Sequence, residues 1–107
     1  MHIQNHFRMS DDEAARLLAN PGACDVVAWG GESLEASYLP MCFQPGGEHG
    51  SLTTHIAKIN PLAAMDGAPA VAMVHGADAF IASAWLSDGE DVEAPGWNYL
   101  VLAAYGR

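Results

Sequence analysis

The sequence predicts a mainly β, α+β domain in which antiparallel strands are joined by short turns and accompanied by two short helices. Short apolar runs recur along the 107 residues, separated by turns rich in Gly and Pro. Only two segments begin with a helix-start signal, and no long amphipathic pattern supplies the crossover helices that a parallel sheet needs. The length allows a single domain, spanning residues 1–107.

The clearest helix is predicted over residues 11–19. Ser10 and Glu13 form an S-x-x-E capping box, in which each side chain can bind the backbone amide of the other. Asp11 and Asp12 add negative charge at the positive end of the helix dipole. The Pro-Gly pair at 21–22 ends the helix.

The strands are expected at 24–29, 33–43, 51–56, 70–74, 79–83 and 97–105. Pro40 indicates a sheet edge or a bulge in the second of them. A second helix should open at Asn60, the N-cap, with Pro61 as its first residue. We expect a bend at 75–78, around Gly76, and an acidic loop at 86–96. The last strand has nothing after it to cover it, so a homodimer is expected.

Composition excludes several classes of function. Four Lys and Arg stand against thirteen Asp and Glu, giving a net charge of −9. Direct nucleic-acid binding is therefore not expected, because it depends on cations that neutralise phosphates. No apolar run reaches the roughly 20 residues of a membrane span, and no secretory signal is present, so a cytoplasmic protein is expected. Cys24 and Cys42 lack C-x-x-C spacing and are expected to be reduced.

The first candidate site is a cluster directly before the second helix. Hydroxyls, an imidazole and the only lysine of the chain occur together there: Thr53, Thr54, His55, Lys58 and Asn60. Backbone amides at a helix N-terminus favour anions, and these side chains would complete a phosphate cradle. The alternative is an edge strand with ordinary polar residues, in which Asn60 serves only as a cap.

A second candidate group flanks the acidic loop. It contains aromatic side chains and polar neighbours that could wall and orient a flat ring system: Ser83, Trp85, Trp97, Asn98 and Tyr99. The alternative is that they anchor a core or an interface. No metal site is predicted, because the five histidines fall in no ligand-spaced motif. No nucleophile elbow is present, and catalytic residues remain unassigned.

Six segments occur in this order along the chain: H-F-R at 6–8, L-P at 39–40, T-H-I-A-K-I-N-P at 54–61, V-H-G…F-I-A-S-A-W at 74–85, P-G-W-N-Y at 95–99 and Y-G at 105–106. Together they resemble the PaiB-like family of FMN-binding negative transcriptional regulators. The W-N-Y and H-x-A-K-x-N-P pieces are the most specific. The resemblance covers nearly the whole chain, and members of that family usually continue beyond this C-terminus.

The resemblance implies an antiparallel split β-barrel that dimerises and holds FMN at the dimer interface. The region of His55, Lys58 and Asn60 would meet the phosphate. The flavin or the facing subunit would be lined by Ser83, Trp85, Trp97 and Asn98. Such a protein would be a flavin-dependent oxidoreductase or a PaiB-like regulator.

The chain also departs from the family pattern. Tyr38 and Ala103 stand where the family has histidines, Ala77-Asp78 replaces Pro-His, and Ala84 replaces a proline. These changes motivate an alternative, a cofactor-free split-barrel paralogue that acts as a regulatory or protein-interaction module. A weaker alternative is a haem-binding split barrel with His55 or His75 as axial ligand.

Overall fold

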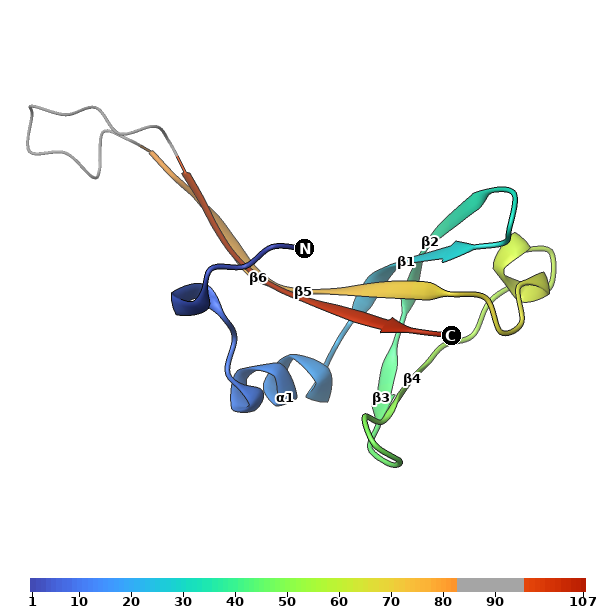
Figure 1. Ribbon diagram of the computed structural model, residues 1–107, viewed down its shortest axis with the longest axis horizontal. Helices are drawn as coiled ribbons and strands as arrows, with labels where there is room; N and C mark the ends of the chain where they lie inside the picture. The colour runs from blue at the N-terminus through green and yellow to red at the C-terminus, as the bar shows by residue number, and fades with distance from the viewer. Residues whose placement is uncertain (83–95) are drawn as a thin grey trace, which may run out of the picture.

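The computed structural model describes residues 1–82 and 96–107, and it is mainly β with one α-helix (Figure 1). Its elements, in chain order, are η1 (Asn5–Phe7), α1 (Asp11–Ala19), β1 (Ala23–Trp29), β2 (Leu34–Pro40), β3 (Cys42–Gln44), β4 (Ser51–Thr53), η2 (Pro61–Ala64), β5 (Ala70–Ile81) and β6 (Gly96–Gly106). The predicted acidic loop lies almost wholly outside the described residues.

The strands form two antiparallel sheets. The larger sheet has the order β2-β1-β5-β6, and the smaller consists of β3 and β4. The predicted antiparallel, mainly β class is therefore confirmed. The described residues do not form a closed barrel, because β2 and β6 remain at the two edges of the larger sheet and β3 pairs only with β4. Closure would require a strand to pair along each of these edges.

Helix α1 begins and ends as predicted. The backbone amide of Ser10 donates to the Glu13 carboxylate at 2.9 Å, and the Glu13 amide donates to the Ser10 hydroxyl at 3.2 Å. Both halves of the capping box are thus present. The hydrogen bonds from the amide and hydroxyl of Ser10 lower the pKa of the Glu13 carboxyl group.

The two strands predicted at 70–74 and 79–83 are one strand, β5, with a β-bulge at the predicted bend. The register against β6 shifts between His75 and Asp78. β5 has one residue more than β6 over this stretch, and the bulge accommodates it without ending the strand. Gly76 lies in this bulge. A Cβ there would come within 2.8 Å of Leu100 Cβ and 3.0 Å of Leu17 Cδ2, so only glycine lets β6 and α1 approach this closely.

Three further predicted elements are shorter than expected. The segment predicted as one strand over 33–43 is interrupted at Met41, directly after Pro40, and forms β2 and β3. The strand predicted at 51–56 ends at Thr53. The second predicted helix is only η2, a four-residue 3₁₀-helix, although Asn60 and Pro61 hold the predicted cap positions. A turn this short leaves little of the dipole that a longer helix would have.

The core lies on one face of the larger sheet, which we call the inner face, where α1 and the β3–β4 hairpin pack. Its centre is Cys24, Met41 and Val74, and the partly buried side chains around them are Leu17, Leu18, Val26, Leu39, Leu52 and Leu102. Burial raises the pKa of the Cys24 thiol. Cys24 and Cys42 are both free, as expected.

On the opposite face of the larger sheet, which we call the outer face, large side chains such as Leu34, Tyr38 and Tyr105 are exposed in the described part of the chain. Successive side chains of a strand point to opposite sides, so the register assigns this face fourteen residues: Ala23, Asp25, Val27, Trp29, Leu34, Ala36, Tyr38, Pro40, Val71, Met73, His75, Val101, Ala103 and Tyr105. In the described part of the chain, no helix is long and apolar enough to cross a membrane.

Candidate functional site

The first predicted cluster lies on an exposed segment that runs from the end of β4 to η2. Thr53, His55 and Lys58 are all exposed to solvent. Lys58 makes no ion pair with any of the described residues. These three side chains are therefore free to bind a ligand or a partner chain.

The other two members of that cluster hold the segment in place. The Thr54 hydroxyl donates a hydrogen bond to the Pro40 carbonyl oxygen at 2.6 Å, which fastens the segment to the end of β2. Asn60 Oδ1 accepts from the Leu62 amide at 2.9 Å, and Asn60 Nδ2 donates to the Ser37 hydroxyl at 3.0 Å. The first amide of η2 is thus already satisfied, so a phosphate site here must depend on side chains.

The second predicted group lies at the other end of the molecule. Trp97 and Asn98 are at the start of β6, where β5 and β6 extend together as an arm beyond the rest of the sheet (Figure 1). Trp97 is more than half exposed, and its ring is 5.7 Å from that of Phe80, at an angle of 51°. The predicted residues Ser83 and Trp85 lie outside the described residues.

One copy of the chain does not bring the two groups together. The long axis of the molecule is horizontal in Figure 1, and the β5–β6 arm lies at its left end, whereas η2 and the segment leading to it lie at the right. The first predicted cluster belongs to the segment between β4 and η2. Trp97 and Asn98 stand on the arm, so a shared site would need a second chain.

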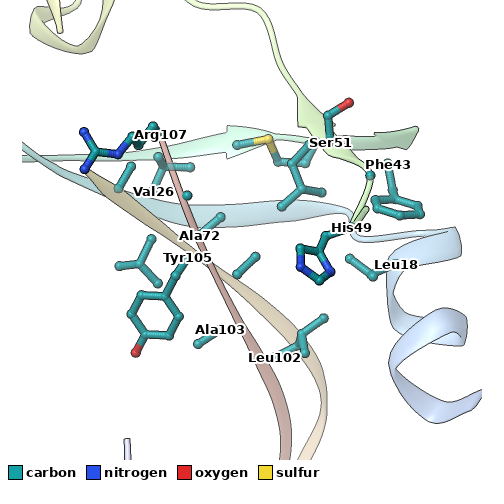
Figure 2. Close-up of a pocket in the computed structure, with 17 residues that line it drawn as sticks. Leu18, Val26, Phe43, His49, Ser51, Ala72, Leu102, Ala103, Tyr105 and Arg107 are labelled. Carbon is teal, nitrogen blue, oxygen red and sulfur yellow. The ribbon is translucent and has the colours of Figure 1, made fainter. Parts of the chain in front are cut away.

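A separate groove of about 570 Å³ lies between the inner face and the β3–β4 hairpin (Figure 2). Its lining is mostly apolar and includes Leu18, Phe43, Leu52 and Leu102, with His49 at one side. None of the eight candidate site residues that the structure describes lines this groove. The groove marks where the inner face is incompletely covered.

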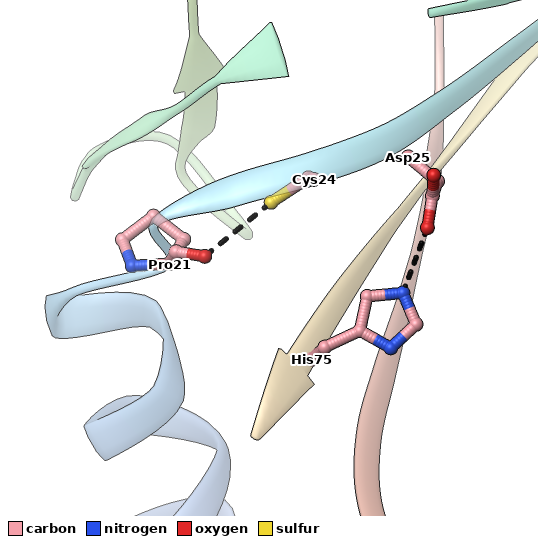
Figure 3. Close-up of polar contacts among 4 residues, drawn as sticks. All are labelled: Pro21, Cys24, Asp25 and His75. Atoms are coloured by element: carbon pink, nitrogen blue, oxygen red, sulfur yellow. Dashed lines mark hydrogen bonds and ion pairs between the residues drawn. The ribbon is translucent and has the colours of Figure 1, made fainter. Parts of the chain in front are cut away.

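The structure also shows a polar pair that the sequence analysis did not identify. Asp25 on β1 and His75 on β5 are diagonal neighbours on the outer face, and His75 Nε2 lies 2.9 Å from Asp25 Oδ2 (Figure 3). Both side chains are about half exposed. The residues are fifty positions apart, and only the β1–β5 register could have revealed the pair.

Metal binding finds no support in the described ranges 1–82 and 96–107, which contain no group of three or more His, Cys, Asp or Glu side chains placed to hold an ion. His75 already has Asp25 as a partner. His55 is exposed on its segment. Neither histidine is enclosed as an axial haem ligand would be within one chain.

Comparison with known proteins gives one match. No curated protein and no solved structure matches the chain. A family model with the description "Putative FMN-binding domain" matches residues 1–107, the whole length of the sequence. The chain therefore belongs to this family of FMN-binding domains.

Proposed function

We propose that this chain binds FMN at a site that two copies of the chain complete, with the phosphate near Lys58. The observation that carries the proposal is Lys58 itself, the only lysine of the chain, which is exposed and has no ion-pair partner in the described residues. Family membership supplies the identity of the ligand. Thr53 and His55 add a hydroxyl and an imidazole on the same exposed segment.

The residues fit the two ends of FMN. The phosphate needs cationic and hydroxyl donors, which the segment before η2 provides. The flat ring system needs aromatic walls and an edge donor or acceptor, which Trp97, Phe80 and Asn98 can provide on the arm. Because one chain holds these groups at opposite ends, a homodimer of split-barrel halves would combine Lys58 of one copy with the arm of the other.

The proposed reaction class follows from the cofactor. When bound, FMN would supply redox chemistry, and this chain would bind it, orient it and restrict access of water. Redox chemistry at a flavin requires no activated side-chain nucleophile. We therefore infer a flavin-dependent oxidoreductase or a flavin-sensing regulator. Any PaiB-like regulation would act through a protein partner, because a chain with a net charge of −9 has little attraction for DNA.

Titration with FMN tests the proposal. Lys58→Ala should weaken FMN binding about 10- to 100-fold, the effect of losing one charged hydrogen bond of roughly 1.5–3 kcal/mol. Binding is followed by quenching of flavin fluorescence. Lys58→Arg should retain much of the affinity, and Arg8→Ala, which removes one exposed cation elsewhere, should leave it unchanged.

One alternative function has a specific observation in its favour. The side chains of Thr54 and Asn60 already make hydrogen bonds within the chain. This is expected of a cofactor-free paralogue, in which these residues have no ligand to bind. A wild-type protein that retains no FMN after gel filtration would overturn our proposal and favour this interaction module. Equal affinity of wild type and Lys58→Ala would instead remove Lys58 from the site.

A further inference from the structure

The groove between the inner face and the β3–β4 hairpin has a floor of small side chains. Ala72 and Ala104 are paired neighbours on β5 and β6, and Ala70 and Gly106 form the next row on the same face. Protein cores leave few voids, so larger side chains at these four positions would fill the space beneath the hairpin. The groove of about 570 Å³ is within the range of small-molecule sites, roughly 300–1,000 Å³ (Figure 2).

The two ends of the groove differ in chemistry. One end is apolar, where Leu18 on α1, Phe43 on β3 and Leu102 on β6 border the space (Figure 2). Arg107 lies at the other end, where it is exposed and makes no ion pair with any described residue. A ligand that is apolar at one end and anionic at the other would complement both ends of the groove.

The charges around the groove also favour an anion. The chain has thirteen acidic residues and a net charge of −9, yet none of the seventeen described residues that line the groove is acidic. Arg107 is the one lysine or arginine among these described residues. The imidazole of His49, also in the lining, lies 3.5 Å from the Glu48 carboxylate. An anion is repelled by the chain as a whole, but here it meets an unpaired cation beside an apolar surface.

We propose that this groove binds an aliphatic carboxylic acid, with its hydrocarbon tail at the apolar end and its carboxylate at Arg107. A guanidinium group can hold a carboxylate by two parallel hydrogen bonds, and each methylene removed from water adds to the affinity. A phosphate dianion would keep much of its charge unpaired beside a single arginine. The proposal does not depend on FMN binding, because none of the described candidate FMN-site residues lines the groove.

The groove suits a hydrocarbon chain better than the outer face does. The outer face is one side of an open sheet, so it can contact a hydrocarbon chain from one direction only. The groove has two walls, the inner face and the β3–β4 hairpin, which contact a chain from both sides. More apolar area is therefore removed from water in the groove, and the two surfaces can be distinguished by where a ligand binds.

Titration with decanoate in the absence of FMN tests the proposal. In methyl-labelled protein, the resonances of Leu18, Leu52 and Leu102 should shift together and saturate. The resonances of Leu34, which is 67% exposed on the outer face, should stay unchanged. Decanoate should bind about tenfold more tightly than octanoate, because two more methylene groups leave the water. Equal shifts of all four leucines, or the absence of a saturable shift, would overturn the proposal.

A substitution on the floor of the groove locates the binding site. Ala104 is half-buried beside the groove, so Ala104→Phe places a ring in the space and should weaken decanoate binding at least tenfold. Ala36→Phe is the matched control, because it makes the same change at an exposed position on the outer face. It should leave the affinity for decanoate unchanged. Wild-type affinity in Ala104→Phe would mean that decanoate binds elsewhere and would refute the proposal.

Arg107→Ala tests the anionic end, and the exposed position makes this variant independent of whether Ala104→Phe folds. It should weaken decanoate binding about 5- to 10-fold, the effect of losing a charged hydrogen bond that is partly screened by water. Binding of decanol, which has the same tail without the charge, should not change. Arg8→Ala, which removes an exposed arginine outside the groove, should affect neither ligand. An equal affinity of wild type and Arg107→Ala for decanoate would contradict the proposed orientation.

Two controls separate the groove from other occupants and from the FMN site. If the three groove leucines shift with rising protein concentration and not with decanoate, a second copy of the chain covers the groove and the proposal is wrong. Lys58→Ala should bind decanoate as the wild type does. A wild type that binds decanoate but no FMN refutes the proposed function alone, and one that binds FMN but no decanoate refutes this inference alone.

Discussion

At the scale of single residues, hydrogen bonding divides the predicted phosphate cluster into two kinds of side chain. The side chains of Thr54 and Asn60 make hydrogen bonds to the backbone and to a neighbouring strand, whereas those of Thr53, His55 and Lys58 are exposed and make none with the described residues. The position of these polar residues directly before a predicted helix start predicted the whole group as one ligand site. Sequence spacing cannot distinguish the two kinds, because both require polar residues close to a turn.

This division predicts different effects of two neighbouring substitutions on stability. Asn60→Ala should lower the free energy of unfolding by about 1 kcal/mol, because the Leu62 amide loses its cap and the Ser37 hydroxyl loses a donor. Lys58→Ala should change it by less than about 0.5 kcal/mol, since the side chain is exposed. Urea unfolding followed by circular dichroism measures both. Equal losses would mean that Asn60 is not the cap on which η2 depends.

At the scale of elements, the capping box of α1 makes a prediction about pH. The pKa of Glu13 is lowered in the folded chain, from an ordinary value of 4.5, by the Ser10 amide and hydroxyl. Its stabilising effect is therefore fully present above about pH 4.5 and is lost as the pH falls through the folded pKa. Glu13→Gln keeps a hydrogen-bond acceptor but not the charge.

The measurement compares the unfolding free energies of wild type and Glu13→Gln across this pH range. The advantage of the wild type should be constant above about pH 4.5 and should shrink as the pH falls below it. An advantage that persists unchanged at the lowest pH would show that the carboxylate charge contributes nothing to the cap.

The elements differ in how well the sequence predicts them. The reason is how far apart in the sequence the residues lie whose interactions define each element. Helix α1 was predicted to the residue because its start signal is local. The bend around Gly76 was also predicted, but its identity as a bulge within one strand depends on pairing with β6. The Asp25–His75 pair depends on the register of β1 and β5, which no local pattern contains.

At the scale of the whole molecule, the balance between buried and exposed apolar residues is unusual for a monomer. Among the residues that the structure describes, the buried hydrophobic ones are Cys24, Ala28, Met41, Ala72 and Val74, all small or of moderate size. Twelve large hydrophobic residues in the described part of the chain are exposed. A domain gains stability mainly from burying apolar area, so this chain should depend on association for much of its stability.

Dependence on association makes thermal stability a function of protein concentration. Unfolding of a 107-residue chain absorbs about 75 kcal/mol, so for a dimer that dissociates as it unfolds the midpoint should rise by about 3 °C for each tenfold increase in concentration. Differential scanning calorimetry from about 5 to 500 μM spans two such steps. A midpoint that stays constant over this range would mean that one chain is stable with its outer face exposed to water.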